Sequence, residues 1–210
     1  LLAARLGKRV VGMAEFENAK DKVLMGGERK SLVMSEDEKR MTAYHEAGHA
    51  LMALAMPECD PVHKATIIPR GRALGLVMSL PEGDRYSKHK SKLLQELAMA
   101  MGGRAAEEIV FGRDRVSNGA AGGIQMGGAP ERRAGPEGGM SDKLGMIAYG
   151  ENSQEVFLGH SVTQSKHVSE ATAQDIDAEI KRIIDEAYAT AMRVLTERRE
   201  ALDTLARGLL

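Results

Sequence analysis

One predicted helix, over residues 36–56, carries the feature that most constrains this chain: the sequence His45-Glu46-Ala47-Gly48-His49. Residues four apart on a helix are separated by about 40° around its axis, so the two imidazoles face the same side. Ser35 followed by Glu38 forms a capping box that predicts the start of this helix, and Pro57 predicts its end. The sequence therefore predicts a long helix whose two histidines can reach one metal ion.

This spacing of histidines around a glutamate is typical of zinc peptidases. His45 and His49 are the candidate metal ligands, and Glu46 is the candidate general base for the water that completes such a site. An amphipathic helix with two surface histidines is the competing interpretation, but the capping box and the helical spacing of apolar residues argue against it. Gly48 costs a helix about 1 kcal/mol relative to alanine. Its missing side chain would let another backbone approach the metal face closely.

Composition restricts the class of protein. The 29 basic and 30 acidic residues nearly cancel and aromatic residues make up 3% of the chain, so neither feature favours nucleic acid as a partner. The single cysteine, Cys59, excludes an internal disulfide and suits a reducing compartment. No apolar run is long enough to span a membrane and no signal peptide is present, so the chain as given is expected to be soluble. Its ends suggest a fragment of something larger.

Helical patterning dominates the chain. Shorter helices are expected over residues 14–25, 91–101 and 104–111. Gly102-Gly103 are expected to break the helical stretch between the last two. An apolar stripe over residues 176–195 predicts a long helix capped by Ser169, with Thr196 capping a following helix. The expected fold is mainly α with a small β unit (α+β), a helical zincin-like peptidase domain that carries H-E-x-x-H on a long helix.

The β unit is expected over residues 62–80, around a solvated, basic turn at residues 69–72. A nucleic-acid surface built on nearby basic residues is a weak alternative, because they lack interleaved aromatic residues and are expected to form a solvated face. These residues are Arg70, Arg72, Lys88, Lys90 and Lys92.

A zinc peptidase needs a third protein ligand. Met52 and Ala55 occupy the positions where a metzincin would have glycine and histidine, so that subclass is excluded. In the other common ligand set, a later helix supplies a carboxylate as the third ligand. Glu107 and Glu108 are candidates for this ligand on spacing alone. An ordinary solvated helix face is the favoured interpretation of both. The other histidines are possible alternatives for the third ligand, but each is expected to stand alone in polar surroundings: His63, His89, His160 and His167.

The chain resembles the peptidase region of the FtsH-type, membrane-anchored, ATP-dependent zinc metalloproteases over nearly its whole length. The likeness is carried by residues 42–50, 60–64, 67–71, 102–108, 115–117 and 156–159. Residues 11–26 resemble the last helix of the family's ATPase module. The resemblance implies that residues 1–28 are the end of an AAA+ ATPase lid with a linker, and that residues 29–210 are the zinc peptidase domain.

By this resemblance His45 and His49 match the zinc ligands and Glu46 matches the general base. The family's third ligand is an aspartate, and its position is occupied here by Gly123. Residues 119–139 contain eight glycines and two prolines where the family has a helix. A natural loop, an engineered replacement and unreliable residue identities are the open explanations. Two histidines and waters would hold zinc more weakly than a complete set, and Glu107 is a weak substitute.

The resemblance implies a zinc-dependent endopeptidase domain in an ATP-driven protease that degrades unfolded or membrane proteins in protein quality control. It implies a homohexamer and a membrane anchor upstream, in the bacterial inner membrane with the catalytic part facing the cytoplasm. ATP and Mg²⁺ would belong to the missing ATPase domain, because the chain contains no Walker motif. Unfolded polypeptide could add as a strand along residues 64–80. The alternative is a catalytically impaired peptide-binding and hexamer-forming module, because Gly123 replaces the third ligand.

Overall fold

The computed structural model describes residues 2–29, 31–71, 73–81, 83, 87–117 and 169–210. In chain order its elements are α1 (Leu2–Arg5), α2 (Met13–Met25), α3 (Glu36–Ala55), β1 (Val62–Thr66), β2 (Leu76–Ser79), α4 (Lys90–Phe111), the 3-10 helix η1 (Arg113–Arg115), α6 (Glu170–Glu197) and α7 (Arg199–Leu209). The predicted α+β class, mostly helical with a small β unit, is confirmed. Among these helices, none combines the length and apolar character that crossing a membrane requires.

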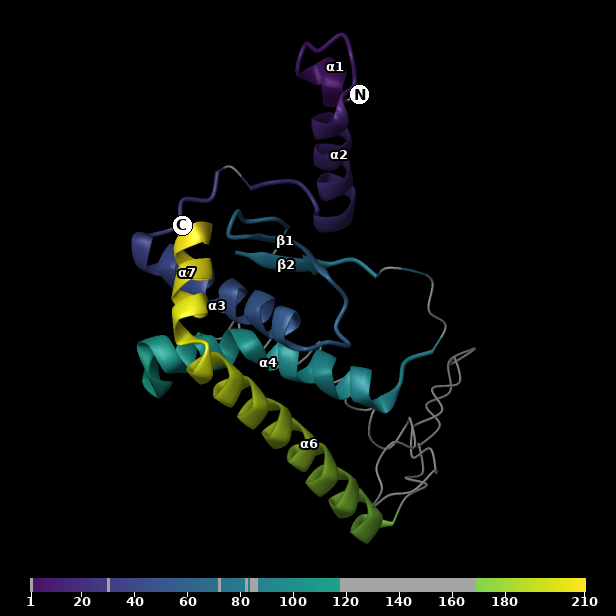
Figure 1. Ribbon diagram of the computed structural model, residues 1–210, viewed down its shortest axis with the longest axis vertical. Coiled ribbons are helices and arrows are strands. Elements are labelled where there is room, and N and C mark those ends of the chain that lie inside the picture. Colours follow the sequence, from purple (N-terminus) through teal and green to yellow (C-terminus); the bar gives the residue numbers. More distant parts are fainter. Residues whose placement is uncertain (1, 30, 72, 82, 84–86, 118–168) are drawn as a thin grey trace, which may run out of the picture.

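Helix α3 lies at the centre of the arrangement. It packs against α4 and α7, and α4 packs in turn against the long helix α6. Strands β1 and β2 lie between α3 and α2, and α1 and α2 extend away from the other helices (Figure 1). Many of the side chains buried where these helices meet are small, which allows close helix packing. They include Ala43, Ala47, Ala98, Ala105, Ala106, Ala187, Ala191 and Ala206.

The ends of α3 follow the predicted signals. The Ser35 hydroxyl oxygen accepts a hydrogen bond of 3.2 Å from the backbone N–H of Glu38, and the Glu38 carboxylate accepts one of 2.9 Å from the backbone N–H of Ser35. This reciprocal pair satisfies two N–H groups that a helix start leaves without partners. Met56 is already extended, as a residue before Pro57 prefers to be. The predicted capping box is confirmed.

Helix α4 corrects the predicted interruption at Gly102-Gly103. The helix runs without a break from Lys90 to Phe111. A Cβ placed on Gly48 would lie 2.3 Å from the Gly102 carbonyl oxygen, and a Cβ on Gly102 would lie 2.7 Å from that of Gly48. The two helices therefore touch backbone to backbone here. Packing of α4 on α3 and α6 outweighs the low helix propensity of the glycines.

The predicted β unit is an antiparallel pair in which Lys64 pairs with Met78 and Thr66 with Leu76. The prediction of a solvated, basic turn is wrong for Arg70, which is 7% exposed. Its guanidinium donates hydrogen bonds to the Glu28 carboxylate at 2.7 Å and to the Gly26 carbonyl at 3.2 Å. Partners from the segment after α2 therefore bury a charge that the local sequence presents as solvated.

Lys92 is likewise not part of a solvated face. It is 4% exposed, and its ammonium donates to the Asp60 carboxylate at 2.6 Å and to the Glu58 carbonyl at 3.0 Å. A buried lysine needs such partners, because an unpaired charge is costly away from water. This pairing also removes Lys92 from any basic surface that could bind nucleic acid.

At the C-terminal end, the Ser169 hydroxyl oxygen accepts a 3.2 Å hydrogen bond from the backbone N–H of Thr172, so the predicted cap of α6 is confirmed. The predicted cap at Thr196 is wrong. Helix α6 continues through Thr196 to Glu197, and α7 begins after the single residue Arg198, with no side-chain cap. The junction is therefore too short to leave Thr196 outside α6 as a cap for α7.

Candidate metal centre

Helix α3 brings the two predicted ligands together. His45 and His49 lie on successive turns, and their Nε2 atoms are 3.1 Å apart. Two nitrogens that bind one tetrahedral zinc ion at about 2.0–2.1 Å lie roughly 3.3 Å from each other. The separation of the imidazoles is therefore close to that of two ligands on one ion.

The other nitrogen of each ring is already engaged. His49 Nδ1 lies 2.9 Å from the Met99 carbonyl oxygen, which can only accept, so Nδ1 carries the proton. His45 Nδ1 lies 2.7 Å from Glu107 Oε1. Burial of Glu107 acts to raise its pKa, but hydrogen bonds from His45 and Ser117 outweigh it and lower the pKa, so the ionised carboxylate accepts from His45. Both tautomers follow from these partners.

When both rings are neutral, these tautomers present the lone pairs of the two Nε2 atoms to each other. Burial lowers the pKa of His49 to about 4, with the charge of His45 acting in the same direction, so His49 stays neutral near pH 7. Lone pairs that face each other at 3.1 Å repel unless a metal ion or a shared proton lies between them. The two Nε2 atoms therefore fit a metal ion bound by both histidines. The hydrogen bonds at the Nδ1 atoms would hold the rings in the orientation that this binding needs.

Glu107 is not on a solvated helix face, as the sequence suggested, but is 1% exposed. Its Oε2 accepts a 2.6 Å hydrogen bond from the Ser117 N–H, and its Oε1 accepts one of 2.9 Å from the Ser117 hydroxyl. Its contact with His45 is to Nδ1, on the far side of the ring from Nε2. Glu107 therefore orients His45, and this contact gives no support to its role as a substitute ligand.

Glu108 lies on another face of α4. Its carboxylate accepts a hydrogen bond from the Tyr188 hydroxyl of α6 and lies 3.4 Å from Arg113. It joins two helices and does not contact the histidines.

Glu46, the predicted general base, is 6% exposed. Burial raises its pKa to about 7, against the opposing charge of His45. A carboxyl group with a pKa near neutrality can both take up and return a proton. The backbone entering β2 lies directly against this side chain, since a Cβ on Gly75 would be 2.7 Å from Glu46 Oε1. Sequence reasoning missed Gly75, although a glycine bordering a strand is a known sign of close approach.

Gly103 keeps space open at the two imidazoles. A Cβ on this residue would lie 2.6 Å from Nε2 of both His45 and His49. Any larger residue at this position of α4 would occupy the place where a metal ion meets its ligands. Sequence reasoning also misses Gly103, because a Gly-Gly pair predicts a helix break.

The described part of the chain places no third ligand beside His45 and His49. The one group of three potential metal ligands found there lies elsewhere and consists of Glu17, Asp21 and His63. The expectation that His63 stands alone is therefore wrong. Gly123, the stretch 119–139, His160 and His167 lie outside the described residues.

A family model described as peptidase family M41 matches residues 32–210. The chain belongs to peptidase family M41. The M41 match covers the metal-centre helices α3 and α4 and begins after α2.

Relatives of this M41 chain named ATP-dependent zinc metalloprotease FtsH align with all 210 of its residues. The protein of Caulobacter vibrioides is 53% identical and the alignment covers 34% of it. That of Magnetococcus marinus is 54% identical with 31% covered, and that of Photobacterium profundum is 49% identical with 30% covered. The M41 chain thus spans about a third of the length of these relatives, and the FtsH-type resemblance is confirmed.

Proposed function

We propose that the chain is the zinc-dependent endopeptidase domain of an ATP-driven, membrane-anchored protease that degrades unfolded or membrane proteins. The observation that carries this proposal is the pair of Nε2 atoms, 3.1 Å apart, on rings whose Nδ1 atoms are both engaged. Membership in peptidase family M41 and the printed name of the relatives, ATP-dependent zinc metalloprotease, support it.

His45 and His49 would hold Zn²⁺ through Nε2. When bound, zinc acts as a Lewis acid that activates water and polarises the scissile carbonyl. Glu107 and the Met99 carbonyl hold the two rings in place from Nδ1. Glu46 takes the proton of the attacking water and returns it to the leaving amine. Gly75 confines the Glu46 carboxylate, and Gly103 keeps the space at the nitrogens free.

An extended polypeptide is the substrate that suits this site. Strands β1 and β2 form a two-stranded sheet that packs on α3 beside the metal centre. Main-chain hydrogen bonds to an edge within residues 64–80 would hold a substrate strand with little dependence on its sequence. We expect an unfolded segment to bind and a tightly folded protein to be refused.

The remaining activities belong to the longer protein in this proposal. Residues 1–28 would be the end of the ATPase lid and its linker, and residues 29–210 the peptidase domain. The 210 residues contain no Walker motif, so ATP and Mg²⁺ would act in an upstream domain. A homohexamer and a membrane anchor upstream, with the peptidase facing the bacterial cytoplasm, complete the proposed protein.

Cleavage of an unstructured fluorogenic peptide by the zinc-loaded chain tests the proposal, with Glu46→Gln as the matched variant. We expect stoichiometric zinc in both proteins and cleavage only in the wild type. Cleavage that survives in Glu46→Gln at the wild-type rate would exclude Glu46 as the base.

A second candidate function is a catalytically impaired module that binds peptide and forms hexamers. It is favoured by Gly123 at the position of the third ligand and by the two-histidine set of the described residues. Peptide binding without stoichiometric zinc and without cleavage would select this module over the endopeptidase.

A further inference from the structure

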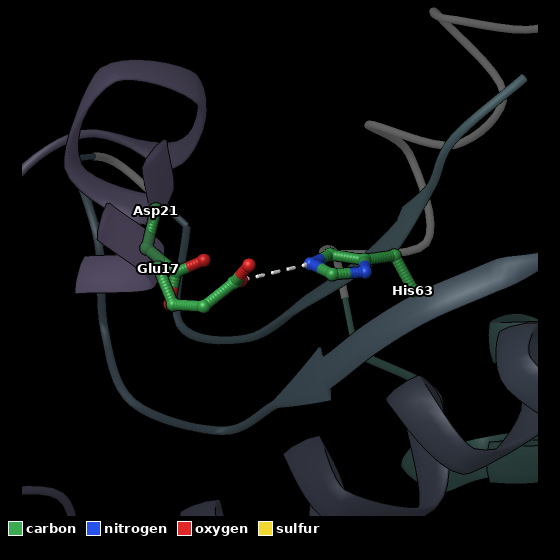
Figure 2. Close-up of side chains that lie close together, drawn as sticks. All are labelled: Glu17, Asp21 and His63. Carbon is green, nitrogen blue, oxygen red and sulfur yellow. Dashed lines mark ion pairs between the residues drawn. The ribbon is translucent and has the colours of Figure 1, made fainter. Parts of the chain in front are cut away.

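A second group of metal-ligating side chains lies where α2 meets the sheet. Glu17 and Asp21 occupy successive turns of α2, and His63 projects from β1. One potential ligand atom from each residue lies within 4.8 Å of the other two. Figure 2 shows the two carboxylates side by side with the imidazole of His63 facing them. His63 Nε2 is 3.6 Å from Glu17 Oε2.

Asp21 supplies the observation that points to a ligand. The residue is 2% exposed, and its Oδ2 accepts a hydrogen bond from the Lys64 ammonium. Its Oδ1 is buried and has no hydrogen-bond partner among the described residues. A buried carboxylate oxygen without a hydrogen-bond partner lowers the stability of the folded chain. The carboxylate of Asp21 points toward Glu17 and His63 (Figure 2). A bound cation would satisfy it.

We propose that Glu17, Asp21 and His63 form a binding site for a divalent transition-metal ion, separate from the pair His45 and His49. Two carboxylates and one imidazole suit Zn²⁺ or a similar first-row ion better than Mg²⁺ or Ca²⁺, which favour all-oxygen sites. Water would complete the coordination. Ligand atoms on one ion lie about 3–4 Å apart. Rotation of the exposed Glu17 side chain and of the His63 imidazole would close the present spacing.

Neighbouring lysines are compatible with this site. Lys20 contacts Glu17 Oε2 at 2.7 Å, and Lys64 contacts Asp21 Oδ2. A carboxylate can bind a lysine through one oxygen and a metal through the other. The lysines therefore hold the carboxylates in place while Asp21 Oδ1 remains available.

The site would join residues on the two sides of the point where the M41 match begins. Glu17 and Asp21 lie on α2, before the M41 match begins at residue 32, and His63 lies within it. A metal ion bound by all three would fix α2 against β1. It would thereby set the orientation of the segment that leads into the peptidase domain.

Titration of the metal-free chain with Zn²⁺ by isothermal calorimetry tests the proposal. The wild type is compared with His63→Ala and Glu17→Gln, and circular dichroism verifies that the variants remain folded. We expect each variant to bind one equivalent of Zn²⁺ fewer than the wild type, or to bind that equivalent at least tenfold more weakly. His89→Ala removes an exposed histidine outside the cluster and is expected to match the wild type.

Uptake of the same number of Zn²⁺ equivalents with unchanged affinity in His63→Ala and Glu17→Gln would overturn the site. Loss in only one of these two variants would also overturn it, because a three-ligand site needs both residues. The comparison measures a difference in equivalents, so it does not depend on whether His45 and His49 also bind Zn²⁺.

Discussion

Gly48 of α3 faces the carbonyl oxygen of Gly102 on α4 so closely that a Cβ on Gly48 would lie 2.3 Å from that oxygen. This contact fixes the distance between the helix that carries the histidines and the helix that carries Gly103 and Glu107. The geometry of the candidate metal centre therefore depends on a backbone contact as well as on the two histidines.

Gly48→Ala is expected to lower the free energy of unfolding by about 1–3 kcal/mol or more, because the new methyl group meets backbone that cannot rotate away. Gly208→Ala is the matched control, since Gly208 lies in helix α7 and has open space at its Cβ position. There, alanine is expected to raise stability by up to about 1 kcal/mol. Denaturant unfolding measures both. Equal effects in the two variants would contradict the contact.

Gly103→Ala is expected to weaken zinc binding by about tenfold or more, because its Cβ would lie 2.6 Å from Nε2 of both histidines. Competition with a chromophoric chelator measures the affinity. Gly27→Ala, at a position with open space, serves as the control and is expected to keep the wild-type affinity. Wild-type zinc affinity in Gly103→Ala would show that the ion does not lie at these two nitrogens.

Glu107→Gln keeps the size of the side chain but removes the charge that orients His45. We expect the zinc affinity to fall by about 10–100-fold, the usual effect of losing a partner behind a metal ligand. Glu108→Gln changes a neighbouring carboxylate that contacts Tyr188 and Arg113, and it should leave the affinity unchanged. The same chelator competition measures both variants. A similar loss in both would point to a general effect of charge on α4.

Tyr188 predicts a change of stability in alkaline solution. Burial, helped by the hydrogen bond to Glu108, raises the pKa of Tyr188 to about 12 in the folded chain. Between about pH 10, where an unfolded tyrosine ionises, and pH 12, the unfolded state loses this proton first. The stability that Tyr188 contributes is therefore present below pH 10 and lost as pH rises through this window.

Thermal unfolding of the wild type and Tyr188→Phe across pH 9–12 measures this effect. The advantage of the wild type over Tyr188→Phe is expected to shrink steadily through the window. A constant difference between the two proteins would show that Tyr188 ionises alike in both states.

Much of α3 could be predicted because its signals are local. Ser35, Glu38 and Pro57 mark its ends, and the spacing of His45 and His49 places both on one face. The glycines of α4 could not be interpreted in this way. Their use lies in the contact with Gly48 and with the imidazoles, which sequence propensity does not contain.

The burial of several charged residues could not be predicted either, because it depends on tertiary contacts. Arg70, Lys92 and Glu107 are charged, yet all three are buried against partners distant in the chain. The neighbours of His63 likewise come from α2, well before it in the sequence. Local patterns show which residues are charged, whereas tertiary contacts decide which of them leave water.

X-ray absorption at the zinc edge is the sharpest test of zinc binding by His45 and His49. The His63→Ala chain is used so that these two residues dominate the signal. We expect zinc bound by two imidazole nitrogens at about 2.0–2.1 Å, and by one fewer imidazole after the further change His45→Ala. A zinc environment without imidazole, or one that His45→Ala leaves unchanged, would contradict this binding.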